Sequence, residues 1–231
     1  MENNYVRSFE FKHSTFSEFE NTAKQAISGF VIDNKIIAAI ESGKFDLQMY
    51  HHLLSGIFHQ VFNSSGSFAL AGSMCNTSQI VEREYLFHHA EEEMTHWQWI
   101  ISDLNETGYV GTDPRDTLPS ASTTAYLSYA YYLALKFPIG RLAMALVLEG
   151  ISGTFGLKYG AQVMKTLKLK PDQAQFFLAH GELDQGHEVD ILKVLSRSNL
   201  NSQELAQLSH VATTTAELYK RIYNDAAWVN T

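Results

Sequence analysis

The chain has 231 residues, of which 45% are apolar and 18% charged, and its 17 lysines and arginines against 25 acidic residues give a formal net charge of −8. This length suffices for one sizeable core, so we predict a single domain over residues 1–231. The acidic balance argues against nucleic acid as a partner, and no apolar run reaches the roughly 18–20 residues that would span a membrane. The single cysteine, Cys75, excludes an internal disulfide and, with no secretory signal in the first residues, indicates a cytoplasmic protein.

Helices are predicted along almost the whole chain, because prolines are sparse and apolar residues recur every three or four positions. Residues 1–13 lack this pattern and are expected to form an arm. Residues 107–121 are rich in glycine, threonine, aspartate, proline and serine, which predicts a long loop, either a lid or a plain surface loop. The predicted fold class is all-α, a bundle of about seven helices. In chain order the expected helices cover residues 15–42, with a bend at Gly29, then 46–73, 77–106, 122–136, 139–166, 171–196 and 202–228.

The sixth expected helix carries His180, Asp184 and His187. Positions i, i+4 and i+7 lie within a narrow arc of an α-helix, so these three side chains point the same way. Two imidazoles and a carboxylate look like half of a metal site. This set of donors suits iron, manganese or zinc better than calcium or magnesium, which usually take oxygen alone.

A second cluster of the same kind lies in the third expected helix. Glu93 and His96 have the Glu-x-x-His spacing that also separates Asp184 from His187. The face they share is partly apolar, and a half-buried carboxylate beside an imidazole needs a partner such as a metal ion. His89 lies one turn before Glu93, and its spacing leaves open whether it supports the site or faces solvent.

Glu149 stands alone in the apolar stretch Ala-Met-Ala-Leu-Val-Leu-Glu-Gly-Ile. An ionised carboxylate in such surroundings is costly unless something pairs with it. Arg141 is about 12 Å away along a helix, too far for direct contact. We therefore interpret Glu149 as a further metal ligand. Small residues beside it would permit close helix approach or local unwinding; they are Gly150, Ser152, Gly153 and Gly156.

Together the candidate ligands combine carboxylates with imidazoles from three expected helices. They are too many for one zinc ion, which normally takes about four ligands. They suit two iron ions, or less readily two manganese ions, bridged by carboxylate in the core of a helical bundle. Such a site can reduce O2 with electrons from both metals, so we expect oxidation chemistry. The candidates are Glu93, His96, Glu149, His180, Asp184 and His187.

The order of these residues resembles that of the heme-oxygenase-like diiron oxidases and oxygenases. The chain shows Glu-x-x-His, a lone Glu some fifty residues on, and His-x-x-x-Asp-x-x-His about thirty residues further. The segments Ile40–Tyr50 and Glu91–Gly108 are also similar to that family. The likeness covers roughly residues 30–225.

The resemblance implies a seven-helix fold that thiaminase-like (TenA-like) proteins share, a cofactor of two Fe(II) ions, and O2 as co-substrate. It implies that the six candidates are ligands, with Glu92 or Glu82 as alternatives to Glu93. Members act on small molecules, often amino acids or fatty acids, so we expect a small, amino-acid-derived substrate in specialised metabolism.

A substrate pocket is expected beside the ligands, lined by aromatic side chains that could equally be ordinary core residues. We expect a homodimer, no membrane partner, and an electron donor from outside the chain. The candidates for the lining are Tyr126, Tyr129, Tyr132, Phe155 and Tyr159.

Several alternatives stay open. A cofactor-free thiaminase-like or coenzyme-synthesis enzyme of the same fold would need a reactive cysteine or a histidine-lined pocket, and Cys75 lies at an expected helix junction away from the polar clusters. A true heme oxygenase needs an axial histidine near the N-terminus, where His13 falls in the expected arm. A ferritin-like iron store would need acidic channels, and a non-catalytic helical binding scaffold would leave Glu149 unexplained. Metal content separates the scaffold from a diiron enzyme.

Overall fold

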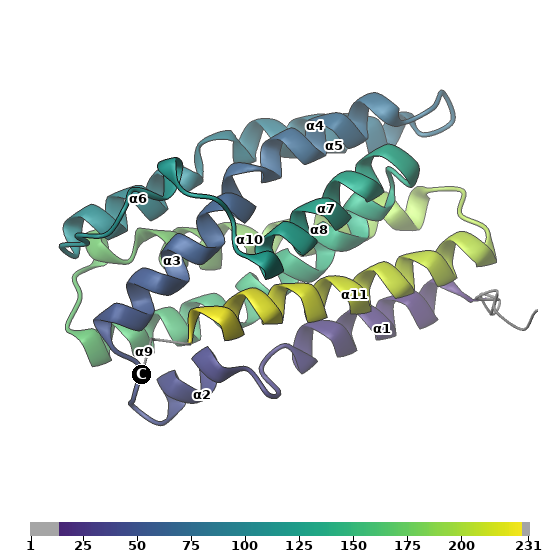
Figure 1. The fold of residues 1–231 in the computed structure, drawn as a ribbon. Helices are drawn as coiled ribbons and strands as arrows, with labels where there is room; N and C mark the ends of the chain where they lie inside the picture. Colours follow the sequence, from purple (N-terminus) through teal and green to yellow (C-terminus); the bar gives the residue numbers. More distant parts are fainter. Residues whose placement is uncertain (1–13, 228–231) are drawn as a thin grey trace, which may run out of the picture.

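The computed structural model describes residues 14–227, apart from the side chains of residues 182–185. This part of the chain consists of helices and connecting turns without a β-strand, which confirms the all-α prediction. The long helices lie side by side in one bundle (Figure 1). The predicted arm over residues 1–13, with His13, lies outside the described residues.

The helices are shorter and more numerous than the sequence predicts. Short turns join several of them: the 3-10 turns η1 (Glu93–Thr95), η2 (Pro114–Asp116) and η4 (Pro171–Gln173), and the π-helical turn η3 (Ser152–Gly156). The α-helices are α1 (Phe16–Gly29), α2 (Lys35–Glu41), α3 (Leu47–Phe62), α4 (Ser64–Met74), α5 (Ile80–Glu92), α6 (Trp97–Glu106), α7 (Ala121–Lys136), α8 (Gly140–Ile151), α9 (Leu157–Leu167), α10 (Gln175–Arg197) and α11 (Ser202–Ala226).

The prediction of one continuous helix over residues 15–42 is wrong, because two helices occupy this segment. Helix α1 ends at Gly29, where a bend was expected, and the chain then turns at Asp33, which has a positive φ of 55°. Asn34 starts α2, because its side chain accepts a hydrogen bond from the Ile37 backbone. Aspartate and asparagine tolerate such turn conformations better than most residues, so the helix can end here. The apolar residues keep their helical spacing on both sides, which is why the sequence pattern hides the end of the helix.

Three further predicted helices are interrupted by a change of backbone hydrogen bonding, one of them, over residues 139–166, at the π-helical turn η3. The segment 46–73 divides at Asn63, which ends α3 and starts α4. The segment 77–106 divides at η1, a single 3-10 turn between α5 and α6. Such a turn leaves the apolar period nearly unchanged, so the sequence pattern does not reveal it.

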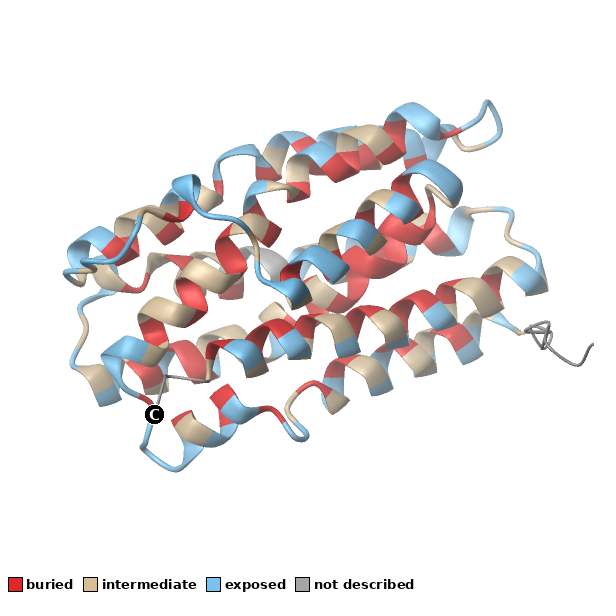
Figure 2. Ribbon diagram, viewed as in Figure 1, coloured by how far each residue is buried: buried red, intermediate tan, exposed pale blue. Residues whose placement is uncertain are grey.

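Helix α8 is the buried centre of the bundle. Every residue of it except Leu148 is buried, and Figure 2 shows it almost entirely in the colour of buried residues. It packs against α1, α10 and α11. A helix that is apolar on all sides is expected to lie in such a position, and this one carries Glu149 into the core.

Two glycines bring the π-helical turn against α10. A Cβ atom on Gly156 would lie 3.2 Å from the Gly181 Cα, and one on Gly181 would lie 2.9 Å from the Leu157 backbone nitrogen. Larger residues at these positions would separate the two helices beside His180. The small residues after Glu149 thus allow both the local unwinding of the helix and the close approach of α10, as their size predicts.

Helix α10 begins at a carboxylate from another helix. Asp103 of α6 accepts hydrogen bonds from the backbone nitrogens of Gln175 and Phe176, at 2.8 and 3.0 Å. The Tyr50 hydroxyl also donates to Asp103, at 3.3 Å. Burial raises the pKa of Asp103 to about 6, although the backbone donors oppose this shift. This anchor fixes the first turn of the helix that carries His180 and His187.

No helix among the described residues combines the length and the apolar character needed to cross a lipid bilayer.

Candidate metal centre

The candidate ligands come from three elements, and from the residue after one of them, in the middle of the bundle. Glu93 lies in η1 and His96 directly after it, Glu149 in the buried helix α8, and His180 and His187 in α10. The side chains of Glu93, His96 and Glu149 are buried. Residues far apart in the sequence thus converge on one place, as the helical spacings predict.

One group of donors consists of Glu93, His96 and His180. Each offers one atom, and these atoms all lie within 4.8 Å of one another. Glu93 Oε1 lies 3.0 Å from His96 Nδ1. His180 Nδ1 lies 3.1 Å from the Phe176 carbonyl oxygen, which can only accept, so this nitrogen carries the proton and Nε2 keeps its lone pair for a ligand.

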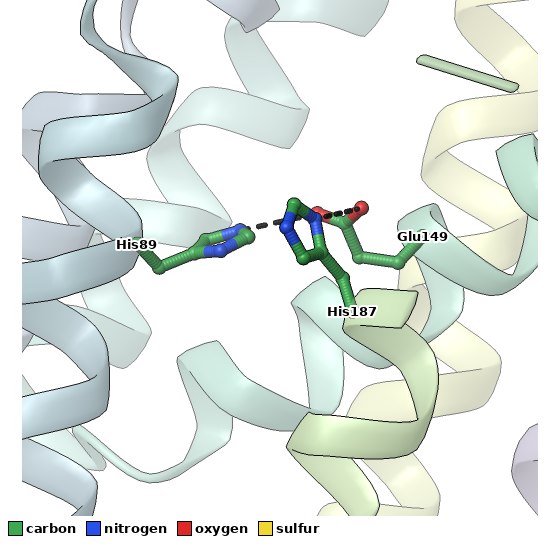
Figure 3. Close-up of side chains that lie close together, drawn as sticks. All are labelled: His89, Glu149 and His187. Atoms are coloured by element: carbon green, nitrogen blue, oxygen red, sulfur yellow. Dashed lines mark hydrogen bonds and ion pairs between the residues drawn. The ribbon is translucent and has the colours of Figure 1, made fainter. Parts of the chain in front are cut away.

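A second group consists of His89, Glu149 and His187, again with donor atoms within 4.8 Å of one another. His89 Nε2 lies 3.1 Å from Glu149 Oε1, and His187 Nδ1 lies 3.3 Å from Glu149 Oε2. Figure 3 shows both imidazoles directed at this carboxylate. Because a carboxylate can only accept, each of these ring nitrogens donates a proton that a metal ion would replace.

Burial and neighbouring charges favour the protonation states that ligands need. Burial alone would raise the pKa of Glu93, but the hydrogen bond from His96 brings the pKa below its ordinary value. Burial lowers the pKa of His180, which favours the neutral imidazole. An ionised carboxylate and a neutral imidazole are the forms that bind a metal ion.

The three alternatives for the first carboxylate lie in different places. Glu93 belongs to a donor group, whereas Glu82 is buried in the first turn of α5 and belongs to neither group of described side chains. Glu92 is partly exposed and lies beside the second group without being part of it. Asp184 lies one turn after His180 in α10, and its side chain is outside the described residues.

His89 is the residue whose role the helical spacing leaves open. It is fully buried, packed between the rings of Phe68 and Tyr85 at centroid distances of 4.5 and 5.7 Å. The available signal was its spacing, since it lies one turn before Glu93 and two turns before His96 on the same face. The same stretch also contains His88 and several glutamates, and these charged residues are equally typical of a solvent-exposed helix face.

The donors present fit a pair of transition-metal ions. Nitrogen and carboxylate ligands lie about 2.1 Å from such an ion, so two ligands of one ion are at most about 4.2 Å apart. Both groups are close to this limit, and side-chain shifts of a fraction of an ångström would complete them. Mixed imidazole and carboxylate donors suit iron or manganese, and calcium and magnesium prefer oxygen alone.

A cavity adjoins the two groups, with about 890 Å³ of empty space that includes its opening to solvent. Glu93, Glu149 and His180 form part of its wall. Of the expected pocket residues, Phe155 and Tyr159 also line it, whereas the three tyrosines of α7 do not. These tyrosines lie in a helix that packs against α4 and α11, and Tyr132 points to solvent.

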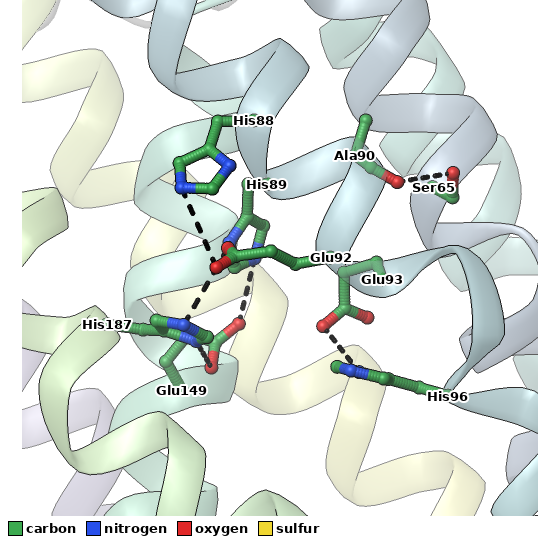
Figure 4. A network of polar contacts seen from close by, with 9 residues as sticks. All are labelled: Ser65, His88, His89, Ala90, Glu92, Glu93, His96, Glu149 and His187. Atoms are coloured by element: carbon green, nitrogen blue, oxygen red, sulfur yellow. Dashed lines mark hydrogen bonds and ion pairs between the residues drawn. The ribbon is translucent and has the colours of Figure 1, made fainter.

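Glu92 lies beside the two histidines of the second group, on the side away from Glu149. Its Oε2 lies 3.5 Å from His89 Nδ1 and 3.8 Å from His187 Nε2, and its Oε1 lies 3.7 Å from His88 (Figure 4). The nitrogens that face Glu92 are the ones that do not face Glu149. A carboxylate in this place orients imidazole ligands and increases their basicity.

Glu92→Gln is expected to weaken metal binding at the second group about 10-fold, because the amide keeps the shape but loses the charge that holds the two imidazoles. A titration with Co(II), followed by its visible absorption, measures the affinity. Glu91→Gln, at the exposed neighbouring position, is the matched control. An affinity equal to that of the wild type would show that Glu92 does not orient the ligands.

Solved structures with the same fold confirm the expected architecture. A domain of unknown function with a heme oxygenase-like fold from Shewanella denitrificans has a TM-score of 0.84 and 21% identity, covering 93% of each chain. A TenA homolog from Pseudomonas syringae has a TM-score of 0.70 and 14% identity, covering 95% of this chain and 98% of its own. The heme oxygenase of the cyanobacterium Synechocystis, in complex with heme, has a TM-score of 0.68 and 14% identity, covering 91% of this chain and 90% of its own.

No curated protein matches the chain in sequence. A family described as iron-containing redox enzymes does match it, over residues 68–220. This range covers more than half of the chain and includes both donor groups and Asp184. The resemblance found in the sequence is thereby confirmed at the level of family and fold. The chain belongs to the family of iron-containing redox enzymes and has the heme oxygenase-like fold.

Proposed function

We propose that the protein binds two iron ions at the two donor groups and uses O2 to oxidise a small molecule in the adjoining cavity. The observation that carries this proposal is the pair of buried imidazole and carboxylate groups that meet at the cavity wall. The iron-containing family supports the choice of metal. Manganese, which accepts similar ligands, is the less favoured metal.

Each donor group has a distinct part in this proposal. Glu93, His96 and His180 would hold one ion, and His89, Glu149 and His187 would hold the other. Asp184 stays a predicted ligand, since its place in α10 follows His180 by one turn. Two Fe(II) ions, when bound, would supply electrons that reduce O2. The buried carboxylates would balance the metal charge, and the apolar walls would keep water from the reacting oxygen.

The finer features of this function are predictions from the family resemblance. They are an amino-acid-derived substrate, a place in specialised metabolism, an external electron donor, a homodimer and a cytoplasmic location. The proposed chemistry at the donor groups does not depend on any of them.

The cofactor-free alternative finds less support. It needs a reactive cysteine or a histidine-lined pocket. The one cysteine of the chain, Cys75, lies in a different pocket beside Arg83 and Phe87, and His180, the histidine of the cavity wall, belongs to a donor group. Burial raises the pKa of the Cys75 thiol to about 11, so the thiol is protonated near neutral pH. A thiaminase-like reaction through this residue is therefore disfavoured.

Anaerobic titration of the metal-free protein with Fe(II), followed by mixing with O2, tests the proposal. We expect two ions per chain by Mössbauer spectroscopy and an absorbance change on mixing that depends on both. Binding of fewer than two ions, or two ions that do not react with O2, would contradict it.

A further inference from the structure

Arg141 is the largest of the fully buried side chains that the structure describes, with 1% of its surface exposed. It lies in α8, the helix that also carries Glu149. Its Nε and Nη1 atoms have no hydrogen-bond partner among the described residues. A guanidinium keeps its charge at any ordinary pH, and a buried charge without close partners destabilises a fold. The core therefore holds a cation whose presence packing alone does not explain.

The ring of Phe68 lies between this cation and the second donor group. The guanidinium carbon of Arg141 lies over the ring, 4.0 Å from its centroid. The His89 imidazole contacts the same ring at a centroid distance of 4.5 Å and an interplanar angle of 84°. His89 Nε2 lies 3.1 Å from Glu149 Oε1 (Figure 3). A continuous line of contacts thus joins Arg141 to the proposed ligands of one ion.

The charges of the metal centre reach Arg141 without pairing closely with it. Burial lowers the pKa of Arg141, whereas Tyr126, Glu93 and Glu149 oppose this shift. Glu149 follows Arg141 by eight residues, which is about 12 Å along a helix. The guanidinium is therefore held in the field of a carboxylate from each donor group.

The protein interior screens such a charge only weakly. With an effective dielectric constant of about 20, two unit charges about 10 Å apart interact strongly enough to change an equilibrium about 10-fold. Phe68 is buried as well, so the contact between Arg141 and His89 passes through a ring and not through solvent. A fixed positive charge in this place opposes each positive charge that is added to the metal centre, and it opposes a trivalent ion more than a divalent one.

We propose that Arg141 supplies a fixed positive charge that acts on the second donor group across the ring of Phe68 and makes the metal centre favour divalent over trivalent ions. Arg141 is a positioning residue in this proposal, since it acts across Phe68 and not as a ligand. The inference rests on the proposed function in that iron is taken as the bound metal. It adds what sets the preference for Fe(II), the form from which O2 takes electrons.

Two neutral variants test the charge. Arg141→Met and Arg141→Gln differ from each other in shape and polarity, but both lose the charge, and a buried charge can often be replaced by an apolar residue without loss of the fold. In the iron-loaded protein, both should shift the equilibrium between Fe(III) and Fe(II) toward Fe(III) at least about 10-fold, which lowers the midpoint potential by about 59 mV. Anaerobic spectroelectrochemistry measures this potential, and far-UV circular dichroism verifies the helical content.

Two controls separate the charge from other effects of substitution. Arg83→Met removes the same charge from an exposed position of α5, where water and salt screen it. Tyr126→Phe removes a hydroxyl from the buried core, and burial raises the pKa of Tyr126, so this change removes no charge. Both controls should keep the potential of the wild type.

Three results would overturn the proposal. The first is an unchanged potential in both neutral variants. The second is an equal shift in the controls, which would show that the charge of Arg141 is not its cause. The third is loss of the helical fold in both neutral variants, because Arg141 would then be needed for folding.

The outcomes for the charge and for the reaction are distinguishable. Two irons that react with O2, with a potential that does not respond to Arg141, would refute this inference alone. A potential that responds, with irons that do not react with O2, would refute the proposed function alone. If iron does not bind, the ratio of Ga(III) to Zn(II) affinity tests the charge in the same variants. This ratio should rise at least about 10-fold when Arg141 is replaced, and an unchanged ratio, or binding of neither ion, would overturn the inference.

Discussion

Glu149→Ala is expected to abolish iron-dependent oxygen consumption and to lower the affinity for iron at the second donor group by at least about 100-fold. The two carboxylate oxygens of Glu149 lie 3.1 Å from His89 and 3.3 Å from His187, so both imidazoles lose the carboxylate that lies nearest to them. The residue is buried in α8, and water cannot readily take the place of the missing carboxylate. No other described carboxylate contributes to that group.

Iron content by mass spectrometry and oxygen uptake with an electrode measure this loss. Glu91→Ala removes an exposed carboxylate and should behave as the wild type. Retention of the helical circular dichroism would show that the effect is local. Normal iron content and normal oxygen uptake in Glu149→Ala would remove this residue from the metal centre and with it the proposed function.

His89→Ala is expected to reduce the bound iron from two ions per chain to one. The change removes a nitrogen donor from the second group and leaves Glu93, His96 and His180 untouched. Since reduction of O2 in this proposal needs electrons from both ions, oxygen consumption should fall at least about 100-fold while one ion stays bound.

His88→Ala is the matched control, because His88 is the preceding residue and its side chain is 68% exposed. Equilibrium dialysis against Fe(II) under nitrogen gives the stoichiometry of both variants. If His89→Ala keeps two ions with unchanged affinity, His89 is a packing residue between Phe68 and Tyr85 and the second ion lies elsewhere.

The sequence was most informative where chemistry and helical spacing coincide. His180 and His187 share one face of a helix whatever the exact ends of that helix, so their side chains could be assigned to the core. Glu149 was identifiable because a lone acid in an apolar helix needs compensation, and the structure places two imidazoles beside it.

Other residues depend on details that the sequence pattern does not carry. His89 and His88 are adjacent, and which of them faces the core follows from how α5 is rotated against α4 and α10. The tyrosines of α7 are as aromatic as Phe155 and Tyr159, yet they do not line the cavity, because their helix packs mainly against α4 and α11. Tertiary packing decides both cases, and a single sequence does not show it.

The 3-10 turn at Glu93 escaped prediction for a related reason. Both it and the π-helical turn after Ile151 change which carbonyl each nitrogen bonds, but only at the 3-10 turn does the composition stay that of a helix. Both irregular turns adjoin candidate ligands. Glycine and serine near Glu149 indicated unwinding there, whereas nothing in Glu-Met-Thr indicated it at Glu93.

The π-helical turn also separates a residue of the metal centre from residues of the cavity wall along one stretch of chain. Glu149 precedes this turn at the metal centre, and Tyr159 and Val163 follow it on the cavity wall. A π-helical turn holds one residue more than an α-helical turn, and each residue rotates a helix by about 100°. Loss of one residue from Ser152–Gly156 would turn α9 away from the cavity and leave Glu149 in place. Insertion or deletion at this point would therefore reshape the cavity wall while the carboxylate on α8 keeps its place.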